Sequence, residues 1–300
     1  MVVTQTDIVA DNGVVHVIDA VLLPPEPEPV SNTIVDVVVG SADFDTLEAA
    51  VIAADLAGVL AGPGPFTVFA PTDEAFAKLP AGTIESLLAD KAALTDILTY
   101  HAIAGEKAAA DVVAAPYLTM VNGAPALIAM GDGKAMINGA VITMTDIRAD
   151  NGVIHVIDTV LLPPPTIAEI VASDDRFETL LAAVTAADLG TTLDEAGPFT
   201  VFAPTDDAFA MVPAEALAAL LADKEALTDV LLFHLVDGVV PASVAVTLSS
   251  ATMKNGDSNP VAYTAGTSTL TVGGATVVIA NVLARNGIIH AIDEVLLPAD

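Results

Sequence analysis

Cysteine and tryptophan are absent from the sequence, and aromatic residues make up only 4% of its 300 positions. The lack of cysteine excludes disulfides, thiolate metal sites and cysteine nucleophiles. It does not exclude an extracellular location, because domains of this size can stand on their hydrophobic cores alone. Hydrophobic residues reach 54%, and much of that content is alanine and valine, so the chain predicts real cores packed from small side chains.

Basic residues are scarce as well. The chain has 9 Lys and Arg against 39 Asp and Glu, which gives a formal charge of -30. A field of that sign repels phosphate backbones and anionic membrane surfaces, so nucleic acid is not expected as a partner. Two interpretations of the acidity stay open. One is a solvated surface suited to salty or dilute extracellular surroundings; the other is self-association through acidic faces bridged by divalent cations.

Long hydrophobic runs are also lacking. The longest apolar stretch, Leu47 to Ala61, is interrupted by Glu48 and Asp55 and is shorter than the roughly 18 apolar residues that suggest a membrane-spanning helix. Met1 is followed by neither a basic start nor a continuous apolar core, so this segment shows no signal peptide. No membrane insertion is expected here.

The chain repeats itself at a spacing of 133 residues. Residues 67–80 read TVFAPTDEAFAKLP, and residues 200–213 read TVFAPTDDAFAMVP. A second signature occurs three times, as DNGVVHVIDAVLLP at 11–24, DNGVIHVIDTVLLP at 150–163 and RNGIIHAIDEVLLP at 285–298. The period is far longer than the 20–50 residues of solenoid repeats, so the units are tandem globular domains.

Domain boundaries follow from the order of the two signatures and from the prolines. Each complete unit begins before the first signature and ends with the second. We therefore expect residues 1–24 to be the C-terminal end of a preceding domain, 25–30 a Pro/Glu linker, and 31–163 and 164–300 two complete domains. Residues 1–24 should be disordered or pair with an exposed sheet edge of a neighbour.

Within one unit the pattern changes from helices to strands. Residues 66–70 read as a short strand, and the apolar spacing over 91–101 predicts a helix. Residues 124–130, 135–137, 141–145 and 153–160 read as strands separated by Gly or Asn. Segregated helices and strands predict an α+β domain.

Several motif residues have structural interpretations. Asp45 with Glu48 resembles a capping box, and Thr72 or Asp73 would cap the helix that follows them. Asn151-Gly152 predicts a hairpin turn, and His155 a buried structural hydrogen bond. A catalytic or metal-binding role for Asp73 and Asp206 stays open as the alternative. The full set of predicted structural positions is Thr72, Asp73, Thr205, Asp206, Asn151, Gly152, His155, Asp158, Asn286, Gly287, His290 and Asp293.

The two signatures, with Tyr100-His101 between them, resemble the fasciclin-I (FAS1) family. The resemblance implies a wedge of about seven β-strands with several helices packed on one side, here in two tandem copies. It also implies a secreted or surface-anchored protein that mediates adhesion. Family adhesion activity is placed near the Tyr-His pair and the end of the second signature, which here correspond to Tyr100, His101, Phe233, His234, Asp158, Leu161, Leu162, Asp293, Glu294, Leu296 and Leu297. The alternative for these residues is a structural one, as core aromatics beside a buried histidine and as plain edge strands.

The favoured function is therefore a non-enzymatic extracellular adhesion module that binds a cell-surface protein or a matrix polysaccharide. The alternative is a carrier of a small apolar ligand such as a carotenoid or lipid, against which the low aromatic content counts. An enzyme is not expected, because no G-x-S-x-G or H-E-x-x-H motif occurs. No cofactor or metal site is expected; loose Ca²⁺ binding at residues 255–259 is the alternative, although EF-hand spacing is missing.

Overall fold

The computed structural model describes residues 3–10, 13–19, 32–195 and 197–298. They divide into a short unit within residues 1–31 and a larger unit over residues 32–300. The predicted Pro/Glu linker at 25–30 lies outside the described residues. Among the described residues, no helix is long and apolar enough to cross a bilayer.

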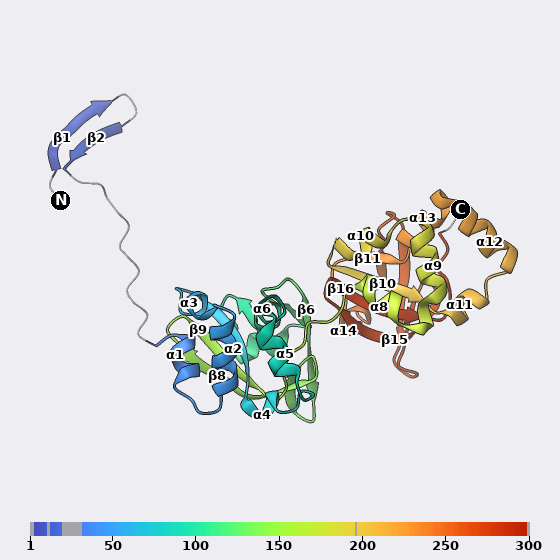
Figure 1. The fold of residues 1–300 in the computed structure, drawn as a ribbon. Helices are drawn as coiled ribbons and strands as arrows, with labels where there is room; N and C mark the ends of the chain where they lie inside the picture. The colour runs from blue at the N-terminus through green and yellow to red at the C-terminus, as the bar shows by residue number, and fades with distance from the viewer. Residues whose placement is uncertain (1–2, 11–12, 20–31, 196, 299–300) are drawn as a thin grey trace. The chain divides into compact units, whose positions relative to one another are not determined.

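The short unit is a hairpin of two antiparallel strands, β1 (Val3–Ala10) and β2 (Gly13–Ile18), shown in blue in Figure 1. Ala10 pairs with Gly13 across its turn. The second signature builds the same kind of strand pair in the larger unit, where Ala149 pairs with Gly152. That residues 1–24 end a preceding domain stays a prediction.

The first domain of the larger unit runs from α1 to β9. Its helices are α1 (Ile34–Val39), α2 (Asp45–Ala53), α3 (Ala57–Leu60), α4 (Asp73–Phe76), α5 (Thr83–Ala89), α6 (Lys91–Thr99) and α7 (Ala109–Ala114). Its strands are β3 (Phe66–Pro71), β4 (Ala102–Ala104), β5 (Tyr117–Thr119), β6 (Pro125–Gly131), β7 (Lys134–Ile137), β8 (Ala140–Ala149) and β9 (Gly152–Ile157).

The second domain repeats this order. Its helices are α8 (Ile167–Ser173), the 3₁₀ helix η1 (Asp175–Phe177), α9 (Glu178–Ala186), α10 (Gly190–Glu195), α11 (Asp206–Ala210), α12 (Ala214–Ala222), α13 (Lys224–Leu232) and α14 (Ala242–Ala245). Its strands are β10 (Phe199–Pro204), β11 (Leu235–Asp237), β12 (Ser250–Thr252), β13 (Ser258–Thr264), β14 (Thr269–Val272), β15 (Ala275–Ala284) and β16 (Gly287–Ile292).

Each domain holds one seven-stranded sheet, in the orders β4-β3-β9-β8-β7-β6-β5 and β11-β10-β16-β15-β14-β13-β12. The strands that carry the two signatures, β3 with β9 and β10 with β16, are parallel neighbours, and the remaining pairs are antiparallel. The predicted α+β class, with about seven strands in each of two copies, is confirmed.

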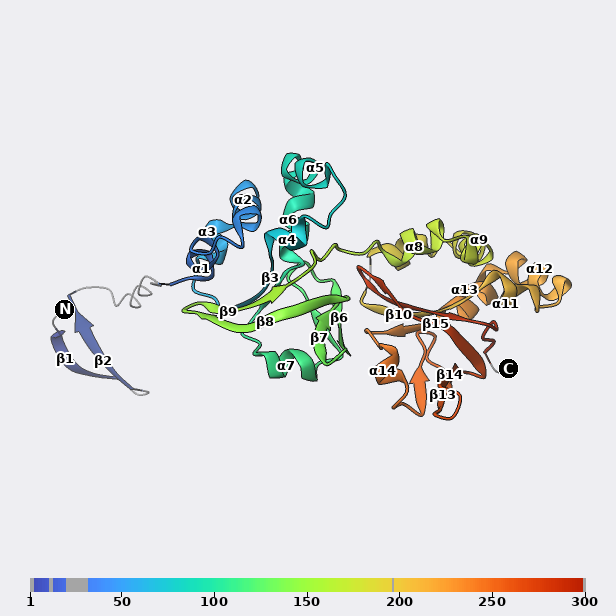
Figure 2. The same cartoon turned by 90° about the horizontal axis from the view of Figure 1, so that it is seen from below.

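Core residues lie on both faces of each sheet. The strand of the second signature is therefore apolar on both of its faces. In β9, Ile154 and Val156 pack into the cluster under the helices, whereas Ile157 packs on the opposite face with Phe69. Figure 2 shows α1, α2, α4, α5 and α6 on one side of the first sheet and α7 on the other. One helix therefore departs from the expected one-sided arrangement.

The capping-box interpretation at Asp45 and Glu48 is wrong. Helix α2 begins after Phe44, whose side chain makes no cap, and the carboxylate of Asp73 accepts from the Thr46 amide instead, at 2.8 Å. Thr72 caps α4 through the Ala75 amide at 3.2 Å. A capping box does occur, at Thr33 in α1 and at Thr166 in α8, because an acidic residue follows each threonine by three positions.

The strand predicted over 153–160 ends earlier, at Ile157, and residues 158–162 form no strand. Residues 293–297 likewise follow β16 without forming one. The edge-strand interpretation of these segments is therefore wrong. Both β9 and β16 lie inside their sheets, and each segment leaves the sheet where its strand ends.

Candidate functional site

The Tyr-His pair follows the last turn of α6, and both side chains are buried. The Tyr100 hydroxyl donates to the Pro125 carbonyl at 2.8 Å and accepts from the Asn138 side-chain amide at 2.6 Å. Burial raises the pKa of Tyr100 to about 12, because the phenolate would lose its hydration. The hydroxyl ties the end of α6 to β6 and to the turn after β7.

His101 joins two segments that lie far apart in the sequence. Its Nδ1 lies 2.8 Å from the Ile97 carbonyl, and its Nε2 accepts from the Leu161 amide at 2.9 Å. This pairing fixes the proton on Nδ1. Burial lowers the pKa of His101 to about 4, so the ring is neutral at physiological pH.

The segment that follows β9, residues 158–162, is thereby held against the pair. Leu161 is buried, whereas the Leu162 side chain is 51% exposed. Asp158 accepts from the Val141 amide at 2.8 Å and pairs with Lys78 at 3.3 Å. The structure thus brings the Tyr-His pair and residues 158–162 together, with Leu162 as the exposed part.

The second domain repeats the arrangement without the phenol. Phe233 is buried, and His234 lies 2.7 Å from the Val230 carbonyl and accepts from the Leu296 amide at 3.0 Å. Burial lowers the pKa of His234 to about 4 as well. Leu296 is buried, whereas Leu297 is 61% exposed. Glu294 is exposed, and Asp293 accepts from the Thr276 amide at 2.6 Å.

The histidine of the second signature is also committed to backbone contacts. His155 Nε2 lies 2.9 Å from the Lys107 carbonyl, and its Nδ1 accepts from the Asp146 amide at 3.3 Å. His290 makes the equivalent contacts with Val240 and Asn281. Neither ring has a nitrogen left for a metal or a substrate.

Asn151 and Gly152 have roles that local pattern did not predict. Because Ala149 pairs with Gly152, the turn itself is Asp150-Asn151. The Asn151 side chain accepts from the Ile34 amide at 2.8 Å and donates to the Leu60 and Gly62 carbonyls, so it ties α1 to the end of α3. A Cβ on Gly152 would lie 2.0 Å from the Phe66 carbonyl oxygen, so only glycine allows β3 to approach this closely. Asn286 and Gly287 stand in the same places in the second domain.

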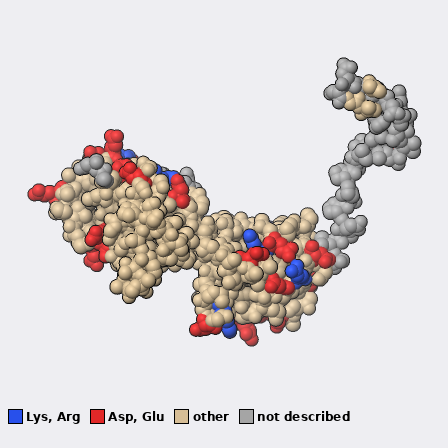
Figure 3. Space-filling model, turned by 180° about the vertical axis from the view of Figure 1, so that it is seen from behind, with Lys and Arg blue, Asp and Glu red and all other residues tan. Residues whose placement is uncertain are grey.

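Acidic residues are dispersed on the face shown in Figure 3, with uncharged residues between them. Within residues 255–259, Asn255 accepts from the Asp257 amide and donates to the carboxylates of Asp229 and Asp257. Within the part of the chain that the structure describes, no group of three or more His, Asp or Glu side chains is placed to hold a metal ion.

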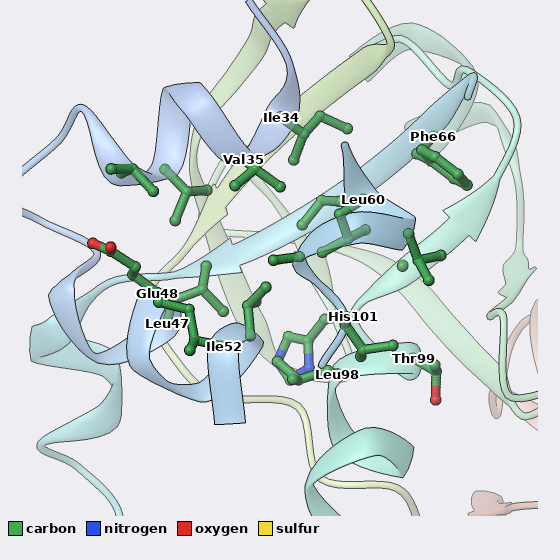
Figure 4. A pocket seen from close by; sticks show the side chains of 18 of the residues that line it. Ile34, Val35, Leu47, Glu48, Ile52, Leu60, Phe66, Leu98, Thr99 and His101 are labelled. Atoms are coloured by element: carbon green, nitrogen blue, oxygen red, sulfur yellow. The ribbon is translucent and has the colours of Figure 1, made fainter. Parts of the chain in front are cut away.

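An apolar pocket of about 250 Å³ lies in the first domain between α1, α2, α3, β3 and the end of α6 (Figure 4). Its lining is aliphatic apart from Phe66, His101, Thr99 and Glu48. The low aromatic content of the sequence argues against an apolar pocket, because such pockets usually have aromatic walls. The walls are instead built from valine, leucine and isoleucine, which local patterns cannot distinguish from ordinary core.

Comparison with known proteins gives the class. The fasciclin domain model matches residues 42–163 and 175–298, so the chain belongs to the fasciclin domain family.

Two relatives illustrate the range of similarity. The pig transforming growth factor-beta-induced protein ig-h3 is 36% identical over 248 residues, which cover 79% of this chain and 35% of that protein. Protein sll1483 of Synechocystis is 51% identical over 134 residues, which cover 44% of this chain and 74% of that protein. The chain thus spans about a third of the length of ig-h3.

Among solved structures, the chain is similar to a FAS1 domain pair from the insect cell adhesion molecule fasciclin I. The TM-score is 0.42 at 20% identity, over 88% of this chain and 96% of that one.

Proposed function

We propose that this chain is a non-enzymatic, extracellular or cell-surface adhesion module whose tandem fasciclin domains bind a cell-surface protein or a matrix polysaccharide. The observation that carries the proposal is the arrangement of the segment after the last strand of each domain. A buried histidine fixes one leucine, and the next leucine, Leu162 or Leu297, is exposed on that fixed segment. A contact residue held in place in this way loses little conformational freedom on binding.

Repetition strengthens such a module. Two copies of the same exposed leucine in one chain raise the effective concentration of the second contact once the first has formed. Modest affinity per domain then gives strong retention on a surface that carries many partners. Membership of the fasciclin domain family supports this proposal, because resemblance to that family implies a role in adhesion.

The histidines support a non-catalytic role. All four histidines of the larger unit, which are His101, His155, His234 and His290, have both ring nitrogens within hydrogen-bonding distance of backbone groups. A general base needs a free nitrogen near its substrate, and these rings offer none.

The test is retention of beads coated with the whole chain on cells and on matrix polymers, with and without calcium. Leu162→Ser and Leu297→Ser should each lower retention several-fold, since a few residues carry most of the binding energy of an interface. Met130→Ser and Met211→Ser, whose side chains are 59% and 62% exposed, are matched controls outside the two segments and should leave retention unchanged.

Two results would refute the proposal. Retention no better than that of heat-unfolded protein would remove adhesion itself. Equal losses in all four variants would remove the two segments as the contact. Retention that depends on calcium would point to self-association through bridged acidic faces.

A further inference from the structure

The pocket of the first domain is a space that the core does not fill. Ile34 of α1, Leu47 of α2, Leu60 of α3 and Val68 of β3 line it, and Figure 4 shows the labelled side chains of these helices surrounding a common space. Its volume of about 250 Å³ exceeds that of the ~150 Å³ apolar cavities that stay dry and take up benzene. It is somewhat smaller than the roughly 300–1,000 Å³ of pockets for drug-sized ligands.

The side chains of the lining offer a polar ligand no free hydrogen-bond donor. Both ring nitrogens of His101 are engaged, and the Thr99 hydroxyl donates to the Thr95 and Asp96 carbonyls of its own helix. Glu48 is the only charged residue of the lining, and it lies at the edge in Figure 4. An occupant must therefore be hydrocarbon inside the pocket, and a carboxylate or phosphate at the mouth would be repelled.

The second domain has the same pocket position but closes it. At the repeat spacing of 133 residues, Ile34, Leu60 and His101 are equivalent to Ile167, Leu193 and His234. These three residues of the second domain line a space of only about 20 Å³. Ala102, which lines the open pocket, corresponds to Leu235, which is buried in the core of the second domain. The three additional carbons of this side chain take up part of the lost space.

A second contact that would close the pocket lies where Val121 and Phe66 line it in the first domain. Val121 of the first domain corresponds to Lys254, whose Nζ lies 5.0 Å from the centre of the Phe199 ring and 2.7 Å from Asp237. Phe199 is buried under this lysine, whereas its counterpart Phe66 is only half-buried. Asp237 in turn replaces Ala104, so the first domain lacks both members of the closing ion pair.

The rim differs in the same sense. Val39, Ile52 and Val59 line the open pocket, and each is more than half exposed. The counterparts of Val39 and Ile52 are Ala172 and Thr185. Exposed β-branched residues gathered around a pocket mark a place where apolar surface is covered by a ligand or partner.

We propose that the first domain, and not the second, binds the aliphatic chain of an uncharged amphiphile. The chain inserts between the three helices and β3, and the uncharged head group stays at the mouth beside Glu48. The volume suits a chain end rather than a whole long polyene. This site is separate from Leu162, so it does not depend on the adhesion proposal.

The probe is 1-decanol, titrated into the whole chain and followed by calorimetry and by methyl chemical shifts. We expect one saturable site per chain. Shortening the alcohol by one methylene should weaken binding about fourfold, because each buried methylene contributes about 0.8 kcal/mol. Decanoate at pH 8 should bind roughly tenfold more weakly than 1-decanol, because its charge meets Glu48.

Exchange of residues between the domains gives matched variants. Ala102→Leu should abolish binding, and the triple variant Leu235→Ala/Asp237→Ala/Lys254→Val should create a second site. If Ala102→Leu fails to fold, the double variant Ala104→Asp/Val121→Lys, which introduces the closing pair of the second domain at the mouth, should weaken 1-decanol binding at least tenfold.

The proposal is overturned if 1-decanol shows no saturable binding, which includes the case in which a second copy or another part of the chain fills the pocket. Unweakened binding in folded Ala102→Leu, or in the double variant where Ala102→Leu does not fold, would overturn it too. Decanoate binding as tight as that of the alcohol would also overturn it.

Discussion

At one strand position the two domains diverge although their backbones pair alike. Val68 pairs with Ala102 in the first domain, and Val201 pairs with Leu235 in the second. One larger side chain, helped by Lys254 at the mouth, accompanies the change from a pocket of about 250 Å³ to one of about 20 Å³. The repeats thus keep the contacts that shape the backbone and vary the side chains that fill the space beside it.

The kept contacts are those of the signatures. In both domains the asparagine, glycine and histidine of the second signature, and the histidine after the helix, make the same contacts with the backbone. Substitutions that remove a shared contact should lower the free energy of unfolding equally in the two domains. Substitutions where the domains differ should have unequal effects.

The largest expected effect is equal in the two domains. Gly152→Ala and Gly287→Ala each place a Cβ 2.0 Å from a carbonyl oxygen of the neighbouring strand, that of Phe66 or Phe199. Each should lower the free energy of unfolding of its domain by about 3 kcal/mol or more, measured by denaturation and by hydrogen exchange of that domain. Gly123→Ala, where a Cβ meets open space at a φ of +88°, is the control and should cost about 1 kcal/mol. Equal losses of unfolding free energy in Gly152→Ala and Gly123→Ala would contradict the close approach of β3 to Gly152.

The next effect should be unequal. Asn151→Ala removes three hydrogen bonds of a buried side chain and should cost about 2–4 kcal/mol in denaturant unfolding. Asn286→Ala should cost less, because Asn286 is half-buried and one of its contacts is long, at 3.5 Å. A larger loss of unfolding free energy in Asn286→Ala than in Asn151→Ala would contradict this prediction.

The pH dependence should again be shared. His101 and His234 have folded pKa values of about 4, below the ~6.5 of an unfolded histidine. The unfolded chain therefore takes up these protons first as the pH falls, so the stability due to the neutral rings is full above pH 6.5 and is lost between about 6.5 and 4. Each domain should lose about 1–2 kcal/mol by pH 5 from this source.

Direct titration checks the sign. The imidazole signals of His101 and His234 should stay at the neutral position until below pH 5 in nuclear magnetic resonance spectra. In His101→Gln the first domain should be less stable at pH 7 and less sensitive to acid. Titration of either ring near pH 6.5 would show that it is not buried as described.

The smallest effect concerns the residue at which the Tyr-His pair differs. Tyr100→Phe leaves Pro125 and Asn138 without a hydroxyl partner and should cost about 1 kcal/mol, while Tyr263→Phe, at an exposed position, should cost nothing measurable. Bead retention should not change, because the hydroxyl is buried. A loss of retention with unchanged stability would instead support the predicted partner contact at Tyr100.

Much of the fold could be predicted from local pattern. The strand over 66–70 and the helix over 91–101 match β3 and α6 to within two residues. β-branched and aromatic residues favour a strand, and helical spacing of apolar residues marks the buried face of a helix. Contacts across the chain could not be predicted. Asp73 lies beside its own helix in sequence yet caps α2, and Asn151 reaches an amide 117 residues away.

The sequence by itself determined the repeat, the α+β class and the family, since these depend on recurring motifs and on periodicity within short segments. Only the tertiary structure decided which leucine of residues 158–162 is exposed, that the Tyr-His pair is buried beside that segment, and that the apolar pocket beside α1, α2 and α3 stays open in the first domain. The physical reason is that a pocket is the space left when side chains from several distant segments meet. Ala102 and Leu235 are both ordinary apolar residues in the chain, and their consequences differ only where the helices surround them.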